Sequence, residues 1–224
     1  METVYLMPSW FKGIDISLEI IFAVITFLVA FFSFRIYHLT GEKEHRNFAI
    51  GFSTISFSYL VWAFLNYFVV SEIQGGICVL RLQEILVVSS ILIYFFMVLY
   101  SFGFFLVYNS TLNQRIFESS GLMFLIITLG LYFVCDKTII FALFSTLFPL
   151  FISIHYFRTY LVNHKGSTFF LALAFILISL SSLLFEFAAD NYIYYLIKHG
   201  LELISYSLIA LILSITLKHG KKKK

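Results

Sequence analysis

The 224-residue chain has few charged residues and few residues that break helices. Asp, Glu, Lys and Arg make up 12% of it, whereas hydrophobic residues make up 61%. A water-soluble domain carries about a quarter of its residues charged, so this composition excludes one. The chain contains only two prolines and 11 glycines, and its long apolar runs lack the period-two alternation of a membrane β-barrel. We therefore predict an all-α, polytopic membrane protein.

The sequence also lacks the motifs that mark common catalytic centres. It contains no nucleophile elbow, phosphate-binding loop, paired Cys-x-x-Cys or His-Glu-x-x-His sequence. No polar stretch is long enough for a domain outside the membrane, and the N-terminus does not have the pattern of a signal peptide. We expect a protein that is not an enzyme, carries no cofactor and binds no nucleic acid.

Seven apolar segments are predicted to form helices. They are residues 14–37, 48–70, 78–108, 121–135, 138–160, 168–189 and 192–217. About twenty residues are needed to cross ~30 Å of hydrocarbon, and the fourth segment, at about fifteen, would be only ~22 Å long. We predict one membrane domain, residues 1–224, made of a first three-helix unit (14–108), a short linker helix (121–135), a second three-helix unit (138–217) and a basic tail (218–224). This is a 3+1+3 bundle of seven transmembrane helices.

The second half of this layout repeats the first. Residues 34–64 match residues 157–187 at a constant offset of 123, with ten identities that include the serines at 56 and 58. Such self-similarity indicates tandem duplication, and two parallel copies would be related by a pseudo-twofold axis along the membrane normal. We interpret the recurring serines as contacts of closely packed helices, and the 29 Phe and 14 Tyr as lipid-facing bulk and interfacial belts.

The distribution of basic residues predicts the orientation. Eleven of the 15 Lys and Arg residues fall at one face of the predicted bundle, including Lys221 to Lys224 at the end of the sequence. Loops rich in Lys and Arg stay cytoplasmic. We expect a multi-pass protein of the cell membrane with its N-terminus outside and its C-terminus inside. The terminal lysines would lie against anionic lipid headgroups, each contributing about 1 kcal/mol.

Ionisable residues inside the predicted spans gather near the opposite, outer face. The candidate ligand-binding residues are Glu19, Arg81, Glu84, Glu186, His199 and Glu202. Ionisable groups within a span are costly and usually mark a functional site. Because Arg81 and Glu84 match His199 and Glu202 at an offset of 118, we expect Glu84 and Glu202 to face each other across the pseudo-twofold axis. The sequence predicts a polar outer pocket that binds a small ligand or a membrane partner, as in a sensor or a complex subunit.

Three alternatives remain open for these residues. They could be i,i+3 ion pairs near the membrane interface. His199, Glu202, Glu186 and Glu84 could instead hold the metal of an intramembrane hydrolase. The third alternative is a small-solute or proton-coupled transporter. The 3+1+3 topology is similar to that of the SWEET and PQ-loop transporters, which implies transport, but the chain lacks their helix prolines and Pro-Gln pair, so no site residue is carried over.

The two cysteines are predicted at the outer face, where a disulfide can persist. Cys78 lies at the start of the third predicted helix and Cys135 at the end of the fourth. A bridge requires their Cα atoms to lie within about 7 Å. The alternative is two buried small hydrophobic side chains.

Overall fold

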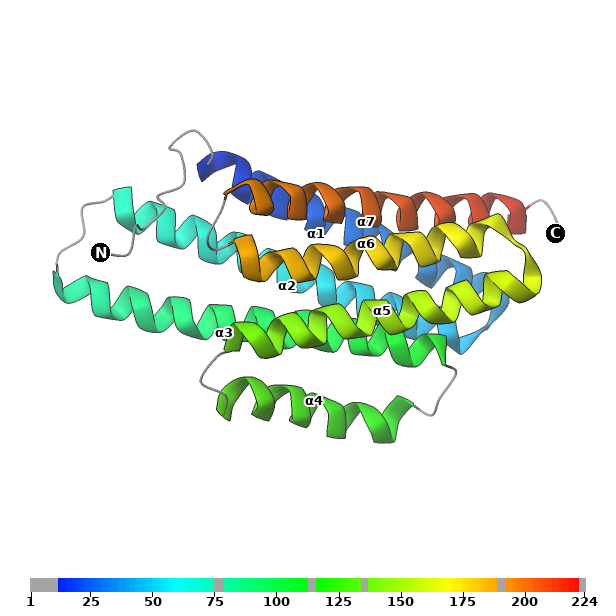
Figure 1. Cartoon of the computed structure of the whole chain (residues 1–224), viewed down its shortest axis with the longest axis horizontal. Helices are drawn as coiled ribbons and strands as arrows, with labels where there is room; N and C mark the ends of the chain where they lie inside the picture. The colour runs from blue at the N-terminus through cyan, green and yellow to red at the C-terminus, as the bar shows by residue number, and fades with distance from the viewer. Residues whose placement is uncertain (1–11, 75–78, 113–115, 134–136, 189–191, 222–224) are drawn as a thin grey trace.

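The computed structural model describes residues 12–74, 79–112, 116–133, 137–188 and 192–221, and side chains in 14–68, 87–112, 121–133, 137–185 and 193–218. The chain forms α1 (Lys12–Thr40), α2 (Lys43–Gln74), α3 (Val79–Thr111), α4 (Ile116–Phe133), α5 (Lys137–Asn163), α6 (Gly166–Ala188) and α7 (Tyr192–Lys221) (Figure 1). For the residues that the structure describes, the prediction of an all-helical fold is confirmed.

Six of these helices, all except α4, are long and apolar enough to cross a membrane. Helices α1, α2 and α3 pack in sequence, as do α5, α6 and α7, and the two sets meet where α1 contacts α7 and α3 contacts α5. The apolar part of α4, Gly121–Phe133, is shorter, and α4 lies outside the six, along α3 and α5 (Figure 1). The described chain is thus a helical membrane bundle with one short peripheral helix.

The helices extend further than the sequence predicted. The expected polar links 38–47 and 161–167 are mostly helical, because α2 already begins at Lys43 and α6 at Gly166. Glu, Lys and Arg are good helix formers, so a charged segment does not by itself end a helix. Each link turns at one left-handed residue, Gly41 (φ 74°) or His164 (φ 51°). The N–H of Gly41 donates to the Tyr37 carbonyl (2.8 Å), and that of His164 to the Tyr160 carbonyl (2.7 Å), which satisfies the helix ends.

Buried serines join neighbouring helices, as the sequence predicted. Ser56 on α2 donates to the carbonyl of Ala23 on α1 (2.8 Å), and Ser179 on α6 donates to the carbonyl of Thr146 on α5 (3.1 Å). A hydroxyl that bonds the backbone of the next helix lets two membrane helices pack closely. The two hydrogen bonds, like the two turns above, are separated by 123 residues at both their donor and their acceptor ends.

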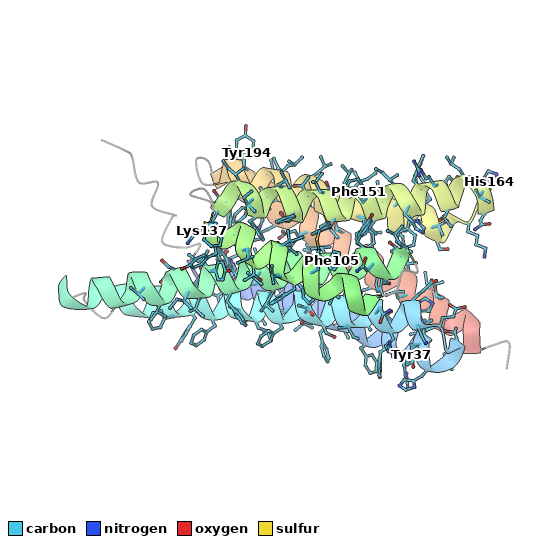
Figure 2. All side chains as sticks on the ribbon, turned by 90° about the horizontal axis from the view of Figure 1, so that it is seen from below. Tyr37, Phe105, Lys137, Phe151, His164 and Tyr194 are labelled. Carbon is cyan, nitrogen blue, oxygen red and sulfur yellow. The ribbon has the colours of Figure 1, made fainter. Side chains whose placement is uncertain are left out.

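The outward faces of the bundle are apolar. Phe27, Phe57 and Phe133 are 58%, 51% and 75% exposed. Phe151 and Tyr194 also reach outward in Figure 2. Large apolar side chains exposed on the outside of a helical bundle are expected where the neighbouring medium is lipid.

Candidate functional site

Five ionisable side chains are buried at the end of the bundle where α1, α5 and α7 begin (Figure 1), here called the polar end. They are Asp15, Glu19, Lys198, His199 and Glu202, each no more than 9% exposed. Every other Asp, Glu, Lys, Arg or His whose side chain the structure describes is exposed or half-buried. Helical spacing explains the clustering, because residues three or four apart lie on one face of a helix.

Helix α7 supplies a charged triplet around Glu202. The Lys198 ammonium lies 3.5 Å from Glu202 Oε1, and His199 Nδ1 lies 3.3 Å from Glu202 Oε2. The latter contact has the distance of an ion pair without the geometry of a hydrogen bond. Lys198 Nζ also lies 5.2 Å from the ring centroid of Phe185 on α6. The predicted i,i+3 pair of His199 and Glu202 is therefore present, but it is buried within the bundle rather than exposed at its rim.

Helix α1 supplies two carboxylates that share one amide. The side-chain amide of Asn66 on α2 donates to Glu19 Oε1 (2.6 Å) and to Asp15 Oδ2 (3.2 Å). Asp15 Oδ1 accepts a hydrogen bond from the hydroxyl of Tyr195 and lies 3.9 Å from His199 Nε2. The α1 and α7 groups thus form one polar cluster.

Three tyrosine hydroxyls meet on the inner side of this cluster. Tyr206, one turn after Glu202 on α7, places its hydroxyl oxygen 3.0 Å from that of Tyr59 and 3.3 Å from that of Tyr100. All three side chains are buried, Tyr206 completely. Their hydroxyls satisfy one another across α2, α3 and α7, so the polar network continues into the middle of the bundle.

A cavity lies between the charged cluster and the tyrosines. Its empty volume is about 380 Å³ with the space at its mouth included, and its free interior is water-sized. All six long helices contribute to its lining, which comprises Glu19, Tyr59, Trp62, Phe96, Tyr100, Phe141, Ser182, Phe185, Lys198, His199 and Glu202. Glu19 Oε2, Glu202 Oε2 and both ring nitrogens of His199 are buried without a hydrogen-bond partner among the described side chains. The cavity therefore offers unused hydrogen-bonding capacity.

Apolar side chains fill the bundle on the far side of the tyrosines. Phe52, Phe104, Phe175, Ile178 and Ile209 come from α2, α3, α6 and α7, and all are fully buried. They lie one or two turns beyond the cavity-lining residues of their helices. In the described part of the chain, the polar network is thus bounded by a packed apolar layer.

No protein-family model matches the chain, and no curated protein or solved structure is significantly similar to it.

The structure brings together three of the six predicted ligand-binding residues. Glu19, His199 and Glu202 line one cavity. The side chains of Arg81, Glu84 and Glu186 lie outside the described ones, as do Cys78 and Cys135, so their predicted roles stay predictions. Among the described residues, no three His, Cys, Asp or Glu side chains are arranged to hold a metal ion.

The contacts of α3 bear on the expected pairing of Glu84 with Glu202. Tyr100 of α3 meets Tyr206 of α7, and Glu202 precedes Tyr206 by one turn. Glu84 precedes Tyr100 by more than four turns, which is ~24 Å along a helix that rises 1.5 Å per residue. Because α3 and α7 both begin at the polar end (Figure 1), Phe96, one turn before Tyr100, is level with Glu202 and lines the cavity with it. Glu84 lies ~18 Å further toward the start of α3, so this register does not favour a pocket with both glutamates.

Several residues of the site were not predicted from the sequence. The interpretation of the aromatic residues as lipid-facing bulk is wrong for Tyr59, Tyr100 and Tyr206, which face one another inside the bundle. Their positions near the middle of apolar helices were the available signal, since interfacial tyrosines belong near helix ends. Asp15 could have been recognised from its i,i+4 spacing to Glu19.

Proposed function

We propose that this chain is a non-enzymatic, multi-pass membrane protein that binds a small polar or charged ligand in the cavity at its polar end, either as a sensor or as a subunit of a membrane complex. The observation that carries the proposal is the set of polar atoms on Glu19, His199 and Glu202 that have no hydrogen-bond partner among the described residues, since all three residues line one cavity. Unsatisfied polar groups inside a membrane bundle cost several kcal/mol. A ligand with complementary groups would remove that cost.

The packing beyond the cavity supports binding over passage through the bundle. The layer of Phe52, Phe104, Phe175 and Ile209 is fully buried, and a solute leaving the cavity in that direction would have to separate these side chains. Close-packed interiors resist such separation. A bundle that holds its ligand near one end is suited to sensing that ligand or to being stabilised by it.

Ligand binding predicts a loss on neutralising Glu19. A ligand present at about 100 times its Kd stabilises the folded state by ~2.7 kcal/mol, so a screen of small polar solutes against the purified protein should raise its melting temperature for the right class. Glu19→Gln should abolish that rise, because the amide replaces the carboxyl group whose Oε2 has no hydrogen-bond partner among the residues that the structure describes. Glu42→Gln makes the same chemical change at a side chain that is 62% exposed and should leave the rise intact. An equal rise in both variants would contradict the proposal.

Transport is the second candidate, and repeated geometry favours it. The turn hydrogen bonds of Gly41 and His164 and the interhelical bonds of Ser56 and Ser179 recur at the offset of the sequence repeat. These observations support two tandem three-helix units joined by α4, a 3+1+3 arrangement that arose by duplication. Repeats of this kind underlie many transporters. Uptake of a stabilising solute into proteoliposomes, with and without a proton gradient, would separate a transporter from a binding protein.

We further propose that the chain lies in the cell membrane. Its polar end would face outward and its C-terminus would lie in the cytoplasm. Residues Glu42 and Lys165 are exposed in the two turns at the opposite end of the bundle, whereas Lys137 is exposed at the start of α5. In a background without Cys78 and Cys135, Glu42→Cys and Lys165→Cys should react with an impermeant maleimide only after the membrane is opened. Lys137→Cys should react in intact cells, and the reverse pattern would overturn the orientation.

A further inference from the structure

The charged cluster contains more acid than base. Asp15, Glu19 and Glu202 supply three carboxylates, whereas the basic groups are one lysine, Lys198, and one imidazole, His199, which lies 3.9 Å from Asp15 Oδ1 and 3.3 Å from Glu202 Oε2. Lys198 lies against Glu202, while Asn66 donates hydrogen bonds to Glu19 and Asp15 without adding charge. Among the described side chains, the α1 carboxylates thus have no lysine or arginine partner. A buried carboxylate needs a positive partner or a proton, and a ligand that is itself a cation and carries N–H protons would supply both.

The cavity surface indicates which kind of cation fits. On one side it presents two oxygens that accept no hydrogen bond from the described residues, Glu19 Oε2 and Glu202 Oε2, the latter 3.3 Å from His199 Nδ1. Most of its other walls are aromatic rings, among them Trp62, Phe96 and Phe141, and the remaining lining residues are Ser182, Lys198 and His199. An alkali-metal or alkaline-earth ion is best held by a full shell of oxygen ligands. Beyond the two glutamates, the lining adds the hydroxyl of Ser182 and those of Tyr59 and Tyr100, which already bond Tyr206. An ammonium group, in contrast, donates hydrogen bonds to carboxylates and is attracted by ring faces.

The side chain of Lys198 illustrates this recognition within the protein. Its ammonium lies 3.5 Å from Glu202 Oε1 and 5.2 Å from the ring centroid of Phe185. A carboxylate and an aromatic face therefore already hold one protonated amine at the cavity wall. Glu19 Oε2 and the remaining rings offer a second place of the same chemistry.

We propose that the cavity binds a small protonated amine, of the size of ammonium or methylammonium, with its nitrogen between Glu19 and Glu202 and any carbon against the aromatic walls. The water-sized interior sets the size of the head group. This inference rests on the proposed function and names the ligand class of the same site.

Tryptophan fluorescence provides a direct test. The chain has two tryptophans, and Trp10→Phe leaves Trp62, in the cavity wall, as the sole reporter. Methylammonium chloride titrated into the purified protein, with NaCl replaced to keep ionic strength constant, should change Trp62 emission in a saturable way. Glu19→Gln should weaken the apparent affinity at least tenfold, and Glu42→Gln should not change it. The titration of the Trp10→Phe protein decides the question even where Glu19→Gln does not fold.

Three outcomes would overturn the amine assignment. Equal responses to potassium chloride and methylammonium chloride would indicate a general monovalent-cation site. A saturable response to acetamide without one to methylammonium would overturn the amine assignment and keep the proposed function, because a neutral polar ligand would then occupy the cavity. A folded protein whose Trp62 emission and melting temperature respond to no solute in the screen would overturn both.

Discussion

Gly103→Ala should lower the stability of the protein by about 3 kcal/mol, because it adds a methyl group where two helix backbones touch. A Cβ on Gly103 of α3 would lie 2.6 Å from Ile55 Cγ1 and 3.0 Å from the carbonyl oxygen of Gly51 on α2. A Cβ on Gly51 would lie 2.9 Å from the carbonyl oxygen of Gly103. The Ile55 side chain can rotate away, but the facing carbonyl can move only with its helix. Close approach of small residues is a main source of packing in membrane helices.

The melting temperature of the detergent-solubilised protein measures this effect. For a chain of this length, ~3 kcal/mol corresponds to a decrease of about 6–12 °C. Gly200→Ala is the matched control, since a Cβ on that residue of α7 meets no atom within 4 Å and alanine favours a helix over glycine. The control should melt at the same temperature as the wild type or slightly above it. Equal melting of Gly103→Ala and Gly200→Ala would show that α2 and α3 do not pack through these glycines.

The sequence was sufficient to predict the helices but not where they end. Apolar runs of the length of a membrane crossing define α1 to α3 and α5 to α7 by composition alone. The link between α1 and α2 was predicted too long, because charged residues compatible with a helix look the same in a loop. Gly41 was the one residue in the first link with a conformational reason to be the turn.

The sequence could predict that the bundle holds a buried polar site, but not all of the residues that form it. Glu19, His199 and Glu202 could be identified because an ionisable residue inside an apolar run is unusual wherever its helix packs. The tyrosine contacts could not, since Tyr59 and Tyr206 are 147 residues apart and meet only through the order of the helices. Composition does not distinguish a tyrosine facing lipid from one facing a neighbouring helix, whereas packing does.

The largest effect on the site itself is expected from removing its lysine. Lys198→Met leaves Glu202, which is 2% exposed, without the ammonium that lies 3.5 Å away. Breaking a buried ion pair by removing one partner typically costs about 3–5 kcal/mol, because the remaining charge is uncompensated. We expect a loss of that size in the free energy of unfolding, measured by denaturant titration in mixed micelles. Lys137→Met changes an exposed lysine at the start of α5 and should have little effect.

A second substitution distinguishes lost charge compensation from lost packing. In the double variant Lys198→Met with Glu202→Gln, the uncompensated carboxylate is gone, so most of the loss caused by Lys198→Met alone should be recovered. The coupling energy from the double-mutant cycle should then be well above the error of additive, independent sites, which is about 0.5 kcal/mol. His199 Nδ1 would keep a neighbour at position 202 that can accept a hydrogen bond. Additive losses in the two single variants would mean that Lys198 stabilises the bundle through its contact with the Phe185 ring and not by balancing the carboxylates.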